Sequence, residues 1–105
     1  MINTEINKLI ESKRENILFL CRQYHIVSIY VFGSVIRNDF RRESDIDLLV
    51  EFDKDFIPGY FTFMKIQKEF SILLEREVDL NTKEDLHDFF KEQIQKEAEV
   101  IYVAA

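Results

Sequence analysis

The sequence predicts a small α/β domain, in which a mixed β-sheet of three to four strands carries helices packed on one face. Two apolar runs, Val27–Phe32 and Ile46–Phe52, have the length and alternation of buried strands. Segments with helical apolar spacing precede the first run and follow the second. With 105 residues, the chain can bury one hydrophobic core, so we expect a single domain spanning residues 1–105.

The N-terminal segment Thr4–Tyr24 is predicted to be one amphipathic helix. Thr4 is the expected N-cap, with Glu5 in the first turn, where the helix dipole favours an acid. Apolar residues recur at helical spacing at Ile6, Leu9, Ile10, Ile17, Leu20 and Cys21. Cys21 therefore belongs to the core, and His25 is expected in a capping or loop position.

A glycine and a serine follow the first predicted strand. Gly33 lets an anion approach the backbone, and Ser34 would begin a short helix, Ser34–Arg41, whose free N–H groups can bind phosphate. Taken alone, the pair is more typical of an ordinary strand-to-helix turn with Ser34 as N-cap, and it is the two aspartates farther along the chain that favour phosphate binding.

Two aspartates lie at the start of the second predicted strand. Asp45 and Asp47 share one face of the strand, while Ile46 and Leu48 pack on the other. Two carboxylates about 7 Å apart along a strand repel each other unless a cation lies between them. Magnesium, which prefers oxygen ligands, is the natural cation for this pair.

The rest of the chain predicts a helix, a short strand and a C-terminal helix and strand. In the helix Tyr60–Leu74 the expected buried stripe is Phe63, Ile66, Phe70 and Leu73, widened by Tyr60, Phe61 and Met64, and the helix is also a candidate for contact with another protein. In the strand Glu77–Asn81, Val78 and Leu80 should face the core and Asp79 the opposite side. Thr82 and Asp85 resemble a capping box, a helix is expected over Asp88–Glu97, and Val100–Val103 is a last strand or a docked tail.

The order Gly33-Ser34, ten residues and then Asp-x-Asp resembles the signature of the polymerase-β-type nucleotidyltransferase superfamily. The short length and the phrase S-D-I-D-L-L-V resemble the minimal nucleotidyltransferases, which serve as antitoxins beside HEPN ribonuclease toxins. The likeness runs from about Ile17 to the C-terminus. Family members often carry an arginine at the position of Arg37, followed by a small residue, whereas Asn38 follows it here.

This resemblance implies a polymerase-beta-like fold and a two-magnesium site. Asp45 and Asp47 would bridge two Mg²⁺ ions, and Asp79, on a neighbouring strand, would bind one of them. Gly33, Ser34 and Arg37 would hold the phosphates of ATP. The implied reaction transfers AMP to a tyrosine hydroxyl of a HEPN toxin and so silences it.

Composition limits the other partners. A formal net charge of −6 argues against direct nucleic-acid binding, which needs a basic surface. Arg41 and Arg42 fit a solvent-exposed charged surface as well as a role beside the predicted phosphate site. Without a membrane-spanning run, and with Cys21 as the lone cysteine, we expect a cytoplasmic protein without disulfides.

Two alternatives stay open at this point. The chain could be an antitoxin that neutralises its toxin by contact alone. It could also be a small-molecule nucleotidyltransferase whose acceptor site is completed by a second subunit.

Overall fold

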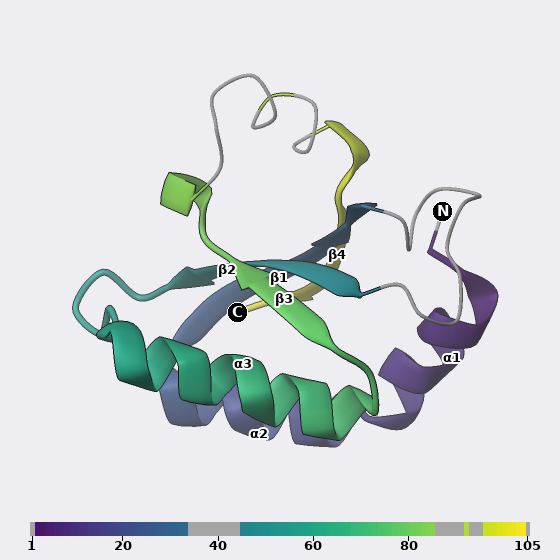
Figure 1. Ribbon diagram of the computed structural model, residues 1–105, viewed down its shortest axis with the longest axis horizontal. Coiled ribbons are helices and arrows are strands. Elements are labelled where there is room, and N and C mark those ends of the chain that lie inside the picture. Colours follow the sequence, from purple (N-terminus) through teal and green to yellow (C-terminus); the bar gives the residue numbers. More distant parts are fainter. Residues whose placement is uncertain (1, 34–44, 86–91, 93–95, 105) are drawn as a thin grey trace.

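A four-stranded mixed sheet, in the strand order β3-β2-β1-β4, organises the chain (Figure 1). The computed structural model describes residues 2–33, 45–85, 92 and 96–104. In chain order the elements are α1 (Thr4–Ser12), α2 (Arg14–Tyr24), β1 (Ile26–Phe32), β2 (Ile46–Phe52), α3 (Tyr60–Leu74), β3 (Val78–Asn81), the 3₁₀ turn η2 (Lys83–Asp85) and β4 (Glu99–Val103). β1 pairs antiparallel with β2 and β4, and β3 pairs parallel with β2. The predicted fold class is confirmed.

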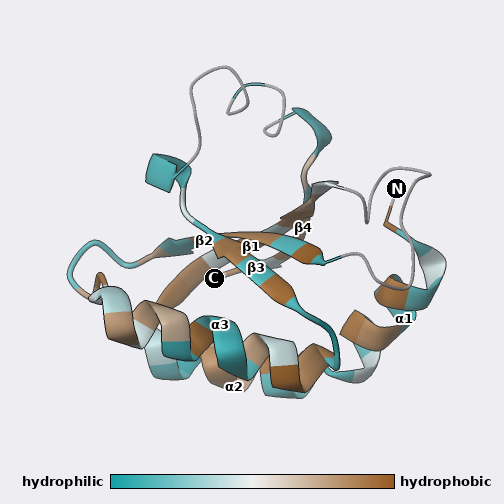
Figure 2. Cartoon of the chain, in the orientation of Figure 1, coloured by the Kyte–Doolittle hydropathy of each residue, from teal (hydrophilic) through white to brown (hydrophobic). Residues whose placement is uncertain are grey.

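The hydrophobic core lies between the sheet and the helices. Figure 1 shows α2 and α3 side by side beneath the sheet. Alternate residues of β2, such as Ile46 and Leu48, join Cys21 of α2 and Phe70 of α3 in one buried cluster. The residues between them on β2 point to the other face, because side chains alternate along a strand. Figure 2 shows that both hydrophobic and hydrophilic residues occur along each of the strands and helices.

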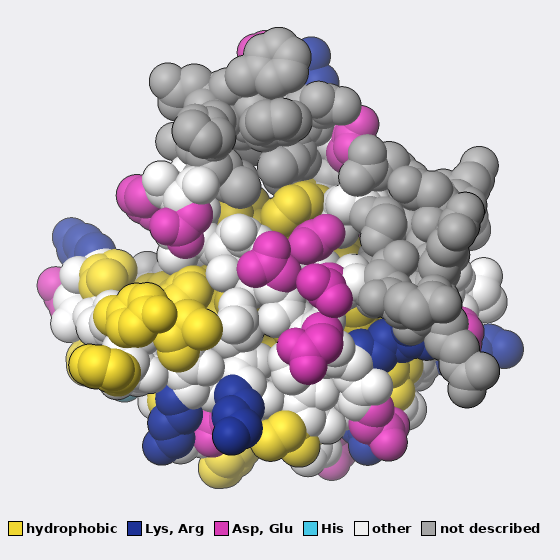
Figure 3. All heavy atoms as spheres, in the orientation of Figure 1, with side chains coloured by type: hydrophobic (Ala, Val, Ile, Leu, Met, Phe, Trp, Pro, Cys, Tyr) yellow, Lys and Arg dark blue, Asp and Glu magenta, His cyan; other side chains and the backbone are white. Residues whose placement is uncertain are grey.

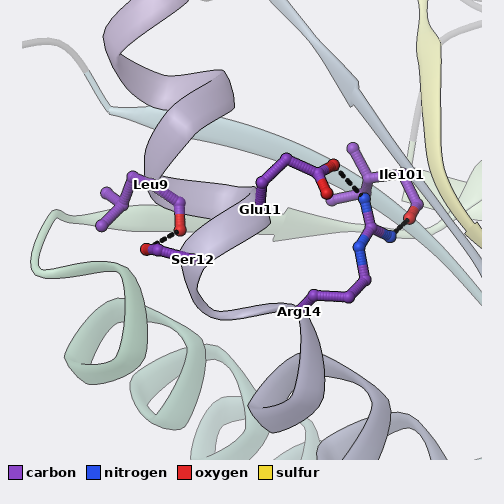
Figure 4. A network of polar contacts seen from close by, with 5 residues as sticks. All are labelled: Leu9, Glu11, Ser12, Arg14 and Ile101. Carbon is purple, nitrogen blue, oxygen red and sulfur yellow. Dashed lines mark hydrogen bonds and ion pairs between the residues drawn. The ribbon is translucent and has the colours of Figure 1, made fainter.

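The prediction of one long N-terminal helix is wrong, because the chain breaks at Lys13 into α1 and α2. The Ser12 hydroxyl donates a 2.7 Å hydrogen bond back to the carbonyl of Leu9, a local bond that competes with helix continuation. The Arg14 guanidinium contacts both the Glu11 carboxylate and the carbonyl of Ile101 in β4 (Figure 4). The break therefore turns the chain where it meets the last strand.

Smaller differences concern the element ends. Asn3, not Thr4, caps α1, since its side chain accepts a hydrogen bond from the Ile6 N–H. His25 ends α2 in the left-handed conformation and donates its N–H to the carbonyl of Cys21, which confirms its capping role. Its ring stacks on Phe56 at a centroid distance of 3.7 Å.

The last part of the chain follows the prediction where it is described. Thr82 donates both its N–H and its hydroxyl to the Asp85 carboxylate and so caps η2. The C-terminal strand is present as β4, paired with β1. The predicted helix Ser34–Arg41, and all but three residues of the predicted helix Asp88–Glu97, lie outside the described residues. Within the described part of the chain, none of the helices is both long and apolar enough to cross a membrane.

Candidate active site

Two of the three predicted carboxylates lie side by side on neighbouring strands. The register of the parallel pair β2–β3 places Asp47 directly opposite Asp79. Their neighbours Ile46 and Val78 are also partners and are buried in the core, so both aspartates face away from the helices. Paired strands lie about 4.8 Å apart, which keeps the two carboxyl groups within reach of one small cation.

Gly33 lies directly beneath the Asp47 carboxylate. Gly33 has a φ of +76°, a conformation that only glycine adopts readily, and a Cβ built on it would lie 2.3 Å from Oδ2 of Asp47. Because Phe32 is the register partner of Asp47, the end of β1 and the start of β2 meet at this point. The predicted glycine and the predicted carboxylate therefore lie next to each other.

Asp45 lies immediately before β2 and is exposed. The first β2 residue, Ile46, donates its N–H to the carbonyl of Glu77, so β3 already runs beside β2 next to Asp45. Alternation places Asp45 on the same face as Asp47 and Asp79. The prediction that all three aspartates share one face is compatible with this placement.

The donor set suits magnesium, which takes carboxylate oxygens and usually retains water. Over residues 2–33, 45–85, 92 and 96–104, no three His, Cys, Asp or Glu side chains are arranged to hold a metal ion together. Neighbouring carboxylates repel one another, and a compact arrangement of them needs a cation in their midst. The three-carboxylate metal site stays a prediction.

Acidic side chains gather in one region of the molecular surface. Figure 3 shows them near the centre of the face on which β3 lies in Figure 1. Glu51, farther along the same face of β2, instead accepts a 3.4 Å hydrogen bond from the Ser28 hydroxyl.

The other predicted site residues cannot be placed. Ser34, Arg37, Arg41 and Arg42 lie outside the described residues. The phosphate contacts proposed for Ser34 and Arg37 stay predictions, although Ser34 follows Gly33 directly in the chain.

One surface feature was only partly anticipated from the sequence. Tyr60, Phe61 and Met64 were expected to widen the buried stripe of α3, but all three are exposed, whereas Ile66 and Phe70 are buried as expected. Apolar spacing identifies which residues could be buried and cannot tell which of them another part of the chain covers. Their exposure leaves an apolar surface at the start of α3.

The chain resembles a known protein family along most of its length. Residues 15–105 match the family model "Polymerase beta, Nucleotidyltransferase". A provisionally named protein adenylyltransferase of Methanocaldococcus jannaschii is 33% identical over 99 residues, which cover 93% of this chain and 97% of the relative. The protein adenylyltransferase MntA of Thermococcus cleftensis is 32% identical over 84 residues, covering 80% of this chain and 81% of the relative.

Solved structures give the same fold. A structure assigned as a minimal nucleotidyltransferase superposes with a TM-score of 0.74 at 31% identity, covering 90% of this chain and 94% of that chain. A chain from the complex of tri-AMPylated Shewanella oneidensis HEPN toxin with MNT antitoxin superposes with a TM-score of 0.65, covering 90% and 72% of the two chains. At 18% identity, this second likeness concerns the fold alone.

Proposed function

Because this chain belongs to the polymerase beta nucleotidyltransferase family, we propose that it transfers AMP from ATP to a tyrosine hydroxyl of a HEPN ribonuclease toxin. The reaction depends on magnesium, takes place in the cytoplasm and makes the chain the antitoxin of that toxin. Nucleotidyl transfer is the activity of the family. For this chain we propose the acceptor, the metal and the role as antitoxin.

The parallel register of β2 and β3 carries the proposal. It sets Asp47 opposite Asp79 on one face of the sheet, with Gly33 directly beneath Asp47. A purely structural protein has little use for adjacent carboxylates on a sheet face, since like charges directly opposite each other destabilise a sheet. The pair is instead the type of donor set that a divalent cation stabilises.

Three aspartates would hold the metal. Asp45 and Asp47 would supply oxygens to two magnesium ions and Asp79 to one of them. When bound, such a pair of ions supplies charge stabilisation for both the attacking and the leaving oxygen. The aspartates would in turn determine where the triphosphate and the acceptor hydroxyl meet, because all three lie at or next to the N-terminal ends of β2 and β3.

The turn after β1 would hold the triphosphate. The missing side chain of Gly33 leaves room for the Asp47 carboxylate, and a glycine at a turn also lets a phosphate approach the main chain. The Ser34 hydroxyl and the N–H groups after Gly33 would donate to the β- and γ-phosphates. Arg37 would offset the charge that develops on the departing pyrophosphate.

In the reaction, the tyrosine oxygen bonds to the α-phosphorus of ATP as the bond from that phosphorus to the β-phosphate bridging oxygen breaks. AMP becomes attached to the tyrosine, and pyrophosphate leaves. Asp79 would either accept the hydroxyl proton as general base or, as a ligand of the nearer metal, help to lower the pKa of that hydroxyl. The products balance the reactants with no oxidant or reductant.

A protein acceptor is supported by the relatives. Two curated relatives are named as protein adenylyltransferases, one of them provisionally, and one chain of similar fold comes from a complex with an AMPylated HEPN toxin. The net charge of −6 disfavours a nucleic-acid acceptor, whose phosphates would be repelled.

The proposal is tested by mixing the chain with its proposed HEPN partner, ATP and magnesium. Intact-protein mass spectrometry should show the mass of the HEPN protein rising in steps of one AMP. Asp47→Asn should abolish the shift, because it removes a carboxylate shared by both metals. Asp45→Asn should do the same, and Asp79→Asn should be severe.

Glu77→Gln is the matched control, since Glu77 is an exposed carboxylate two residues before Asp79, and it should transfer AMP like the wild type. The aspartate variants should still fold and bind the partner, because each change removes a like-charge repulsion. Variants that rescue cells from the toxin as well as the wild type, with no mass shift on any partner residue, would establish neutralisation by contact instead.

A further inference from the structure

An apolar surface lies where α3 begins, and nothing in the described part of the chain covers it. We define the α3 apolar surface as Ile57, Tyr60, Phe61 and Met64. The exposed fractions of Ile57, Tyr60 and Phe61 are 66%, 71% and 86%. Tyr60 and Phe61 also contact each other edge to face, with ring centroids 5.6 Å apart. Contiguous exposed aromatic side chains are typical of a protein contact site.

A groove of about 740 Å³ adjoins this surface. On one side it is lined by Ile57, Tyr60 and Met64, and on the other by Thr82 and the residues of η2. Lining residues of β2, such as Phe52, form the far end of the same strand whose beginning carries Asp47. The groove is therefore large enough to receive side chains of a partner, in addition to the flat contact that Phe61 offers.

The groove and the carboxylates belong to one continuous surface. Glu51 lines the groove and lies four residues after Asp47 on β2, so it shares the face of Asp47 and lies about 13 Å along the strand from it. Figure 3 shows the hydrophobic side chains and the acidic group on the same face of the molecule, with only uncharged atoms between them. A protein that covers the apolar surface can thus present a hydroxyl to the aspartates at the same time.

Lysines flank the apolar surface. Lys65 and Lys68 are exposed on α3 and follow Phe61 and Met64 by four residues, which places each lysine beside its apolar neighbour on the helix surface. Figure 3 shows Lys or Arg side chains adjoining the hydrophobic group. The groove itself is lined by both signs of charge, Glu51, Glu84 and Asp85 beside Lys54 and Lys83. The positive charge is therefore confined to the helix surface, where it suits a partner with carboxylates beside an apolar segment.

We propose that the α3 apolar surface and its groove are the docking site for the acceptor protein of the transfer reaction. This inference rests on the proposed function for the identity of the occupant. The partner places an apolar segment in the groove and acidic side chains against Lys65 and Lys68. A second copy of the chain is a poorer occupant, because a two-fold contact through this surface sets the same lysines against each other.

The test compares Phe61→Glu with Phe19→Glu. Both replace an exposed phenylalanine of a helix by glutamate, and Phe19, on α2, is 66% exposed. Binding of the proposed HEPN partner is measured by calorimetry, AMP transfer by mass spectrometry, and ATP binding with magnesium as a check on the site. Phe61→Glu should weaken partner binding by about tenfold or more and slow transfer at low partner concentration, with ATP binding unchanged. Phe19→Glu should match the wild type in all three measurements.

Each failure has a distinct signature. If the wild type binds and transfers AMP and Phe61→Glu behaves identically, the docking site is wrong and the proposed function stands. If the wild type binds without transfer and Phe61→Glu abolishes binding, the docking site stands and the proposed reaction is wrong. No binding by the wild type, or a self-association of the chain that Phe61→Glu removes, overturns the proposed occupant.

Discussion

Gly33 and Asp47 are in contact across the end of β1, and the position tolerates no side chain. Gly33→Ala should destabilise the protein by about 1–3 kcal/mol, because its φ is positive and L residues are strained there. Its methyl group would also have to displace the Asp47 carboxylate, whose Oδ2 lies 2.3 Å from the position of a Cβ. The free energy of unfolding, measured in urea, should therefore fall, and the rate of AMP transfer should change as well.

Gly59→Ala is the control for this substitution. Gly59, the N-cap of α3, has a φ of −74°, and a Cβ there would meet nothing within 4 Å. The lower entropy of the unfolded alanine chain and the weaker capping by alanine act in opposite directions. Its stability should change by no more than about 0.5 kcal/mol. Equal effects of the two substitutions would contradict the role assigned to Gly33.

Cys21 gives a prediction for alkaline pH. Burial raises the pKa of its thiol from 9.0 to about 12. The unfolded thiol ionises near pH 9 while the folded thiol keeps its proton, so the stabilisation is complete below pH 9 and is lost as the pH rises towards 12. This loss has a limiting slope of about 1.4 kcal/mol per pH unit.

Urea unfolding between pH 8 and 11 checks the Cys21 prediction. Cys21→Ala should lose less stability than the wild type over this range, although it should be less stable at pH 8 because it removes buried volume. Identical slopes for the two proteins would show that the thiol does not carry the effect. In the native protein the thiol should also react slowly with alkylating reagents at pH 8.

At the scale of elements, α3 closes the outer edge of β3. The Leu80 N–H donates a 2.9 Å hydrogen bond to Oε1 of Gln67, and the Val78 N–H donates a 3.0 Å bond to the Ser71 hydroxyl. Ser71 in turn donates to the carbonyl of Gln67 within α3. The side chains of the helix thus take the place of a further strand.

Gln67→Ala and Ser71→Ala should each cost about 1 kcal/mol, because each leaves a partly buried N–H without its acceptor. Hydrogen exchange should accelerate at Leu80 in the first variant and at Val78 in the second. Lys68→Ala, an exposed change on the same helix, should leave both amides protected. Unchanged exchange at Leu80 in Gln67→Ala would refute the assigned bond.

At the scale of the whole molecule, charge should make nucleotide binding depend on the metal. The chain carries a formal net charge of −6, and its acidic side chains gather on the face that would receive ATP (Figure 3). Chelation of magnesium should therefore weaken ATP binding by about tenfold or more, which corresponds to ~1.4 kcal/mol. Calorimetry that gives equal ATP affinity with and without magnesium would contradict the site as proposed.

Local patterns predicted most of the sheet and the orientation of its aspartates. Alternation along V-D-L was enough to turn Asp79 away from the core, because Val78 and Leu80 had to be buried. The pairing of β3 with β2 could not be obtained from alternation, and it was expected from the family resemblance. The contact of Gly33 with Asp47 joins the residue after β1 to β2, and alternation along a single strand could not predict it either.

Long-range contacts explain what the sequence did not predict. No glycine or proline in the sequence marks the break at Lys13. The Arg14 side chain next to it donates a hydrogen bond to the carbonyl of Ile101, 87 residues away. The exposure of Phe61 could not be foreseen either, because helical spacing records hydrophobicity and not the presence of a neighbour that covers it.

The capped edge of β3 also limits how copies of the sheet can join. Among the described strands, β3 and β4 are the two outermost. A sheet with two open borders can be extended in both directions and so grow without end, as fibres do. Here the β3 border is occupied by Gln67 and Ser71, so strand addition is confined to β4. Strand-to-strand association through this sheet therefore stops at a pair and cannot propagate into a filament.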